Sequence, residues 1–324
     1  MKPFESFLGQ KIEKYVAYRK SLGFSLHPMT SHIRSFDRYL AMRNPDPTVL
    51  RPSFFLELRT DLNLESRSVN RILSTTRMFF QYLVRQGVYT ANPVKDIPLL
   101  PENEIIPFIF SEKQVDLLLK AILDSIRKNQ RYFLKDLTGY MAILLLARCG
   151  MRISEPLKMK VHHFRPKEKT LYVEKTKFKK DRLIPVPIPV AAELENYLSA
   201  RNVLIGDHQN PFLLASTQKK GLNDYRVRCV FGQALKDIQI HQSRQIIGNI
   251  NFSAPTVHSL RHSFAVNTLK RVQARGRSPQ NALPVLAAYM GHSEYKHTVK
   301  YLKMIDAKKR KQFLDFALLQ KEKP

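Results

Sequence analysis

A stretch with four prolines and little periodicity lies about a third of the way along the chain, and it constrains the fold more than any other feature. Residues 92–107 show little hydrophobic periodicity and contain prolines at 93, 98, 101 and 107. Proline lacks the backbone donor that a helix needs, so the stretch predicts an extended linker. We therefore expect an N-terminal domain over residues 1–97, a linker over 98–110 and a second domain over 111–324.

Apolar residues before the linker recur at helical spacing, which predicts a small all-α domain. Helices are expected over 4–24, 31–42, 52–59 and 66–86, with Gly23 and Gly87 ending the first and the last. Arginines occur along the fourth helix at 67, 71, 77 and 85. Two interpretations of them stay open, a basic stripe that contacts a DNA backbone and an ordinary solvated helix face.

The second domain is predicted to be mainly helical with a small β-sheet. Ser111 and Gln114 have the spacing of a capping box, and residues 134–149 are apolar nearly all round, as in a buried central helix. Residues 170–187 read as strand, polar turn and strand. Further helices are expected over 190–198, 224–238, 259–271, 279–290 and 296–321.

Charge points to a polyanionic partner. The 324 residues include 54 Lys and Arg against 27 Asp and Glu, a formal net charge of +27. Basic side chains that neutralise phosphates release counterions, so binding to nucleic acid should weaken steeply with salt. Charge alone does not distinguish DNA from RNA or anionic lipid.

Cysteine content and hydropathy indicate where in the cell the protein is expected. Only Cys149 and Cys229 occur, and no secretory signal opens the chain, so a disulfide framework is not expected and a cytoplasmic location is. The most apolar run, residues 141–147, is too short to cross a bilayer. No membrane partner is predicted.

Five residues in three motifs point to phosphoryl transfer. They are Arg152 in GMRISE, His258 and Arg261 in HSLRH, and His292 and Tyr301 in GHSEYKHTVKY. Two arginines can hold the oxygens of one phosphodiester, histidines can hydrogen-bond it or move a proton, and a tyrosine hydroxyl can attack phosphorus. Taken singly, each of these residues is more often structural. No Gly-rich phosphate loop or zinc motif occurs, so neither a metal nor a nucleotide cofactor is predicted.

The order and spacing of these motifs resemble the tyrosine recombinases, the phage-integrase-like enzymes that break and rejoin DNA. The resemblance implies an N-terminal SAM-like core-binding domain and a mixed α/β catalytic domain. It also implies that Arg152 and Arg261 bind the phosphate and that Tyr301 is the nucleophile. His292 completes the site, and His258 contacts the phosphate and helps to handle the proton of Tyr301.

Three further residues are interpreted beside this set. Glu155 is expected to orient Arg152, whereas His262 is expected to be structural. Matching the lysine-rich segment 174–186 to the family's hairpin gives Lys177 as the general acid, with Lys175 as the second choice.

The resemblance further implies site-specific recombination of double-stranded DNA for integration, excision or transposition of a mobile element. The first implied partner is DNA, which would place the protein on the nucleoid. The others are accessory recombinases and further copies of the chain, in a tetramer that exchanges the C-terminal helix. Two alternatives stay open: a type IB topoisomerase-like enzyme, and an accessory DNA-binding subunit without turnover.

Overall fold

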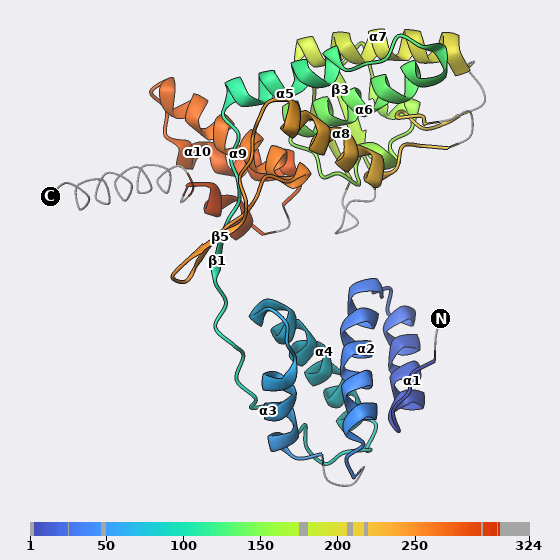
Figure 1. Cartoon of the computed structure of the whole chain (residues 1–324), viewed down its shortest axis with the longest axis vertical. Coiled ribbons are helices and arrows are strands. Elements are labelled where there is room, and N and C mark those ends of the chain that lie inside the picture. Colours follow the sequence, from blue (N-terminus) through green and yellow to red (C-terminus); the bar gives the residue numbers. More distant parts are fainter. Residues whose placement is uncertain are drawn as a thin grey trace, which may run out of the picture. The chain divides into compact units, whose positions relative to one another are not determined.

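The computed structural model describes residues 3–24, 26–46, 50–174, 181–205, 210–216, 220–292, 294–302 and 304. The chain divides into two compact units, Met1–Asn103 and Glu104–Pro324, and the division lies within the proline-rich stretch. Figure 1 shows the elements of each unit. No helix among the described residues is both long enough and apolar enough to span a membrane.

The described residues of the first unit form four helices around an aromatic core. They are α1 (Gly9–Ser21), α2 (His27–Arg43), α3 (Pro52–Asp61) and α4 (Ser66–Arg85). Phe36 of α2 packs against Phe55 of α3 and Phe80 of α4, and all three rings are buried. The helical unit predicted from the apolar spacing is therefore present.

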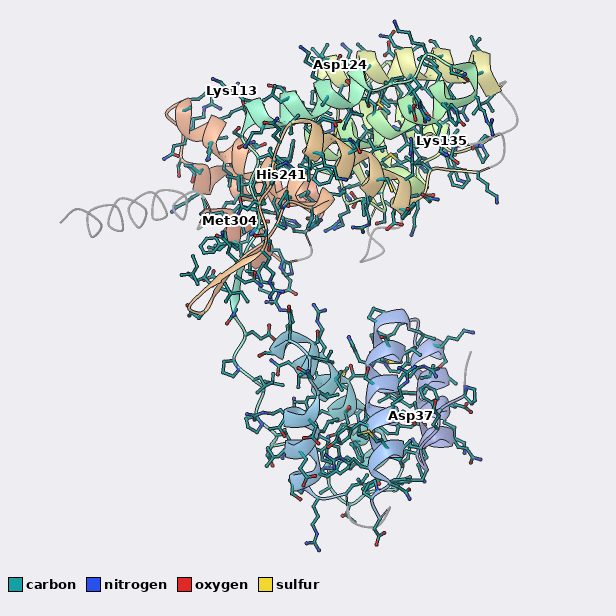
Figure 2. The ribbon with its side chains drawn as sticks, in the orientation of Figure 1. Asp37, Lys113, Asp124, Lys135, His241 and Met304 are labelled. Atoms are coloured by element: carbon teal, nitrogen blue, oxygen red, sulfur yellow. The ribbon has the colours of Figure 1, made fainter. Side chains whose placement is uncertain are left out.

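The first helix begins at Gly9, later than the start expected at residue 4. The buried carboxylate of Asp37, labelled in Figure 2, accepts hydrogen bonds from the backbone N–H groups of Glu5 and Ser6 at 2.8 and 3.1 Å. It also accepts one from the Ser6 hydroxyl at 2.6 Å. A carboxylate on α2 thus holds the entry segment as a turn, which no local pattern predicts.

The arginines of α4 have different surroundings. Arg77 donates to the carbonyl oxygens of Val94 and Ile97 at 3.0 and 2.7 Å, and Arg67 pairs with Glu102 at 2.9 Å. These two residues hold the segment that follows α4. Arg71 and Arg85 are exposed. Arg67 and Arg77 therefore have a structural role, and both interpretations of the basic stripe now apply to Arg71 and Arg85.

The second unit is organised around the buried helix α6 (Gln130–Arg148), which contacts four of its other helices. The helices of this unit are α5 (Glu112–Asp124), α6, α7 (Ile188–Ile205), α8 (Asp224–Asp237), α9 (Val257–Ala274) and α10 (Pro279–Met290). Residues 296–302 are also helical. The mainly helical fold class is confirmed, and α7 extends beyond the expected 190–198.

Two small sheets complete the unit. The predicted hairpin is present as β3 (Thr170–Val173) antiparallel to β4 (Arg182–Pro185), and β2 (Phe164–Arg165) pairs with β3 as a third strand. Two short 3-10 helices, Pro156–Lys158 and Val161–His163, precede β2. A second sheet has the order β1 (Glu104–Ile106), β6 (Ile250–Phe252), β5 (Gln245–Ile247). The sequence did not predict it, because three-residue strands are too short to show alternation.

Candidate active site

Two glycine turns at helix ends form the frame of the site. Gly150 follows α6 with a φ of +57°, and Gly291 caps α10 with a φ of +64°. Side chains other than glycine rarely adopt this left-handed conformation. A Cβ at Gly150 would lie 2.3 Å from a ring carbon of Phe264. Both turns direct helix-terminal carbonyl groups, which carry partial negative charge, toward a common point.

Two predicted arginines bind these carbonyl groups. Arg261, buried on α9, donates to the oxygens of Gly150 and Met290 at 2.7 and 2.6 Å. Arg152 donates to the oxygen of Gly291 at 2.8 Å and to Glu155 Oε1 at 2.9 Å. The ends of α6 and α10 thus hold two guanidinium groups in fixed orientations.

A third arginine, which the motif analysis did not select, completes the cluster. Arg182, the first residue of β4, donates two hydrogen bonds to Glu155 at 3.0 and 2.9 Å and a third to the carbonyl oxygen of Tyr289 at 2.9 Å. Burial opposes ionisation of Glu155, but the hydrogen bonds and charge of Arg182 hold its pKa below the usual value. Glu155 therefore orients Arg152, as expected, and Arg182 as well.

The cluster carries an excess of positive charge. Within the described part of the chain, the guanidinium groups of Arg152, Arg182 and Arg261 are accompanied by one buried carboxylate, Glu155. Burial, followed by the charge of Arg152, lowers the pKa of Arg261 to about 10. Because buried charge is costly unless it is paired, this site is suited to an anion.

Tyr301 lies beside the arginines, in the helical segment 296–302. Its side chain is buried, and its hydroxyl oxygen is 3.2 Å from Nδ1 of His262. The ring of His292 stacks on that of Tyr301 with centroids 6.1 Å apart, and its Nδ1 lies 2.7 Å from the Thr298 hydroxyl. Burial raises the pKa of Tyr301, although the charges of Arg261 and Arg152 act to lower it.

The three imidazoles of the site are in their neutral form. Burial, then the charges of nearby imidazole and guanidinium groups, lower the pKa of His262 and of His292 to about 3. Burial and the charge of Arg261 also lower the pKa of His258, whose ring meets that of His262 edge-on at 4.6 Å. Near neutral pH each ring therefore keeps one nitrogen that can accept a hydrogen bond.

The structure thus brings together Arg152, His258, Arg261, His292 and Tyr301. Lys177 and Lys175 lie outside the described residues. Two residues of the cluster were missed, Arg182 and His262. His262 lies one helical turn after His258, and this spacing is the one sequence signal that placed it near the site. Arg182 begins the strand that follows the lysine-rich segment, and no motif marked it.

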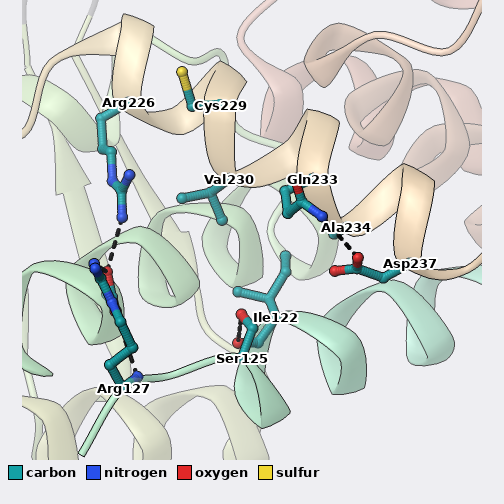
Figure 3. Close-up of a pocket in the computed structure, with 10 residues that line it drawn as sticks. Ile122, Ser125, Arg127, Arg226, Cys229, Val230, Gln233, Ala234 and Asp237 are labelled. Atoms are coloured by element: carbon teal, nitrogen blue, oxygen red, sulfur yellow. Dashed lines mark hydrogen bonds and ion pairs between the residues drawn. The ribbon is translucent and has the colours of Figure 1, made fainter.

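A separate cavity of about 360 Å³ lies between the ends of α5 and α6 and one face of α8, as Figure 3 shows. In it the Asp136 carboxylate accepts hydrogen bonds from Arg127 at 2.7 and 2.8 Å and from Arg226 at 2.8 Å. These ion pairs join α8 to the α5–α6 connection. None of the predicted site residues that the structure describes lines this cavity.

A mainly helical unit with clustered arginines, neutral histidines and a buried tyrosine defines a protein of the tyrosine recombinase class. Residues 109–308 match the model of the phage integrase family, and residues 17–87 match the phage integrase N-terminal SAM-like domain. The chain therefore belongs to the phage integrase family. The resemblance found in the sequence is confirmed, and the enzyme is of the tyrosine recombinase type.

Relatives of similar length agree with this assignment. A putative integrase/recombinase, y4rE of Sinorhizobium fredii, is 29% identical over 308 residues, which is 93% of each chain. The tyrosine recombinase XerD of Rickettsia prowazekii is 24% identical over 91% of each chain. The fold is similar to that of lambda integrase (75–356), seen as a dimer bound to a COC′ core site, with a TM-score of 0.64 and 19% identity over 89% of this chain and 96% of that chain.

Proposed function

We propose that the protein cuts and rejoins double-stranded DNA at specific sites through a 3′-phosphotyrosine intermediate, with Tyr301 as the nucleophile. The observation that carries this proposal is the arginine cluster beside Tyr301, in which two guanidinium groups pair with Glu155 and a third, that of Arg261, has no carboxylate of its own among the described residues. A phosphodiester supplies the missing negative charge. Integration, excision or transposition of a mobile element is the cellular use that we propose.

Arg152 and Arg261 are proposed to bind the non-bridging oxygens of the scissile phosphate. Each guanidinium is fixed by two hydrogen bonds and has further N–H donors to offer. Donors that are already oriented stabilise the charge that develops on phosphorus without reorganisation during the reaction. Arg182, with three bonds to Glu155 and Tyr289, acts as a positioning residue.

The remaining predicted residues are proposed to handle protons and to contact the phosphate. The Tyr301 oxygen forms a bond to phosphorus while the bond from phosphorus to the 5′ oxygen breaks. Lys177 gives that oxygen its proton, a neutral histidine of the cluster accepts the proton of Tyr301, and His258 and His292 hydrogen-bond the phosphate. The choice of Lys177 is supported by its position in the sequence between Val173 and Arg182, which pair with each other, because Arg182 belongs to the cluster. A free 5′-hydroxyl then attacks the phosphotyrosine and rejoins the strand.

We further propose that domains 1–97 and 111–324, joined by 98–110, bind the same duplex, and that four copies assemble on it. Lambda integrase has been seen as a tetramer bound to a Holliday junction. In this chain an apolar groove of about 860 Å³ lies between β4, α9 and α10, with Phe264 and Leu286 in its wall. We propose that it receives, from a neighbouring copy, the part of the expected helix 296–321 that follows Tyr301, nearly all of which lies outside the described residues. Accessory recombinases and location on the nucleoid belong to the same proposal.

Covalent trapping tests the proposal. Wild-type protein is incubated with nicked duplexes from the flanks of its own gene and analysed on denaturing gels. We expect a protein–DNA band that Tyr301→Phe abolishes without loss of DNA affinity, because only a hydroxyl is removed. Tyr295→Phe is the control, since Tyr295 is half exposed and should cross-link normally.

Other results would change the assignment of the nucleophile or of the function. A band that persists in Tyr301→Phe would refute the nucleophile. Salt-sensitive binding without a band in the wild type would favour the accessory DNA-binding role. On a supercoiled plasmid that carries the same flanking DNA, relaxation without strand exchange would favour the topoisomerase-like enzyme.

A further inference from the structure

His262 is the histidine that contacts the reacting hydroxyl group. It lies on α9 four residues after His258, and its Nδ1 is 3.2 Å from the Tyr301 oxygen. The two rings come from different elements, α9 and the helical segment 296–302, and their centroids are 5.7 Å apart. The ring of His258 meets that of His262 edge-on, with centroids 4.6 Å apart, whereas the hydroxyl of Tyr301 is 3.2 Å from His262. The direct partner of Tyr301 is therefore not the histidine that the motif comparison selected.

We propose that Nδ1 of His262 accepts the hydrogen bond of the Tyr301 hydroxyl, orients its oxygen toward phosphorus and takes its proton as the oxygen–phosphorus bond forms. This inference rests on the proposed function, in which Tyr301 is the nucleophile. The proton passes from Tyr301 to Nδ1 while the bond from phosphorus to the 5′ oxygen breaks. A separate acid supplies the proton of the leaving 5′ oxygen. In the rejoining step the proton returns from His262 to Tyr301.

The groups that face His262 explain why the transfer waits for DNA. Burial is the main reason that the pKa of His262 is about 3, and His258, Arg261 and His292 lower it further. The ring is therefore a neutral acceptor but a very weak base in the free protein. A phosphodiester bound to Arg152 and Arg261 adds a negative charge that offsets the effect of Arg261 on His262, which makes His262 more basic. Removal of the tyrosine proton is thereby coupled to binding of the scissile phosphate.

The test isolates the attack step with a nicked duplex in which sulfur replaces the bridging 5′ oxygen at the scissile phosphate. A thiolate leaves without a proton, so the general acid is not needed and only nucleophile activation limits the rate. The measured quantity is the single-turnover rate of covalent complex formation. Lys177→Ala should be slow on the oxygen substrate and recover on the sulfur substrate, whereas a His262 defect should persist on both.

Two substitutions separate orientation from proton transfer. His262→Phe removes the acceptor, and we expect a rate loss of about 100-fold or more on both substrates with unchanged DNA affinity. His262→Asn places an amide near the position of Nδ1, so it keeps an acceptor that cannot hold a proton. We expect it to regain part of the rate. His241→Asn, an exposed histidine labelled in Figure 2, is the control and should react like wild type.

The pH dependence gives a readout that a purely structural role would not change. Hydroxide must replace the missing base in His262→Asn, so its rate should rise more steeply with pH than that of wild type. Equal pH slopes, or wild-type rates for His262→Phe on the sulfur substrate, would overturn the inference. If Tyr301→Phe still cross-linked, the proposed function itself would fail, and if Tyr301 were required while His262 were dispensable, only this inference would.

Discussion

At the scale of single residues, the site depends on backbone as much as on reactive side chains. The Gly150 carbonyl accepts the hydrogen bond that orients Arg261, and its left-handed conformation turns the chain toward Arg152 after α6. Phe264 fills the space where a side chain at this position would stand. A residue without a functional group thus determines where two guanidinium groups lie.

Replacement of Gly150 tests this dependence. Gly150→Ala should lower the free energy of unfolding by about 2–4 kcal/mol, because it adds left-handed strain to an overlap with Phe264. Gly248→Ala is the matched control, since its φ is +58° but no atom lies within 4 Å of an added Cβ. Strain alone should cost about 1 kcal/mol there. Chemical denaturation measures both, and equal losses would contradict the steric explanation.

Arg152 should matter more for rate than for binding. In Arg152→Ala, Arg182 still satisfies Glu155 with two hydrogen bonds, so the fold should persist. We expect a loss of about 2–4 kcal/mol in transition-state stabilisation and a much smaller loss in DNA affinity. Arg148→Ala, which removes a more exposed arginine paired with Asp116, is the control for lost charge. Equal losses in rate and affinity for Arg152→Ala would show that the contact is already made in the bound substrate.

At the scale of elements, a helix start can be predicted from the sequence where the capping residues lie next to it in the chain. Ser111 accepts a hydrogen bond from the Gln114 N–H at 3.2 Å, and the Gln114 side chain accepts one from the Ser111 N–H at 2.9 Å. This capping box begins α5 at Glu112, as the spacing predicted. The start of α1, which depends on Asp37 about 30 residues away, was not predictable in this way.

Removal of the capping box should destabilise the second unit measurably. Ser111→Ala leaves the Gln114 backbone N–H without its side-chain acceptor and should cost about 1 kcal/mol. Ser199→Ala, in the exposed part of α7, removes only a bond back to the Glu195 carbonyl and should be nearly neutral. Thermal unfolding of both variants checks this, and an unchanged midpoint for Ser111→Ala would show that tertiary contacts alone hold the start of α5.

At the scale of the whole molecule, charge determines how the protein meets DNA. The net charge of +27 is distributed over the chain, since residues 1–100 contain 15 basic and 8 acidic residues and the rest of the chain is basic as well. The parts of the chain before and after the linker are therefore both basic, and both attract a polyanion. Non-specific affinity should come from this distribution rather than from the buried site.

Salt titration separates the two contributions. Between about 50 and 200 mM salt, affinity for an arbitrary duplex should fall by about 10³-fold or more if six or more phosphates are contacted. Tyr301→Phe should show the same slope, because it changes no charge. Fluorescence anisotropy with a labelled duplex measures this, and a flat dependence would contradict an electrostatic mode of binding.

The sequence by itself determined the family, the two-part organisation, the mainly helical fold and five of the residues now found together. Those signals are local in the chain: proline content, helical periodicity and short motifs. Only the tertiary structure showed that Arg182 shares Glu155 with Arg152, that helix-end carbonyls hold Arg261, and that His262 rather than His258 meets Tyr301. These contacts join residues up to 111 positions apart, and their geometry follows from the packing of α6, α9 and α10, which no local pattern encodes.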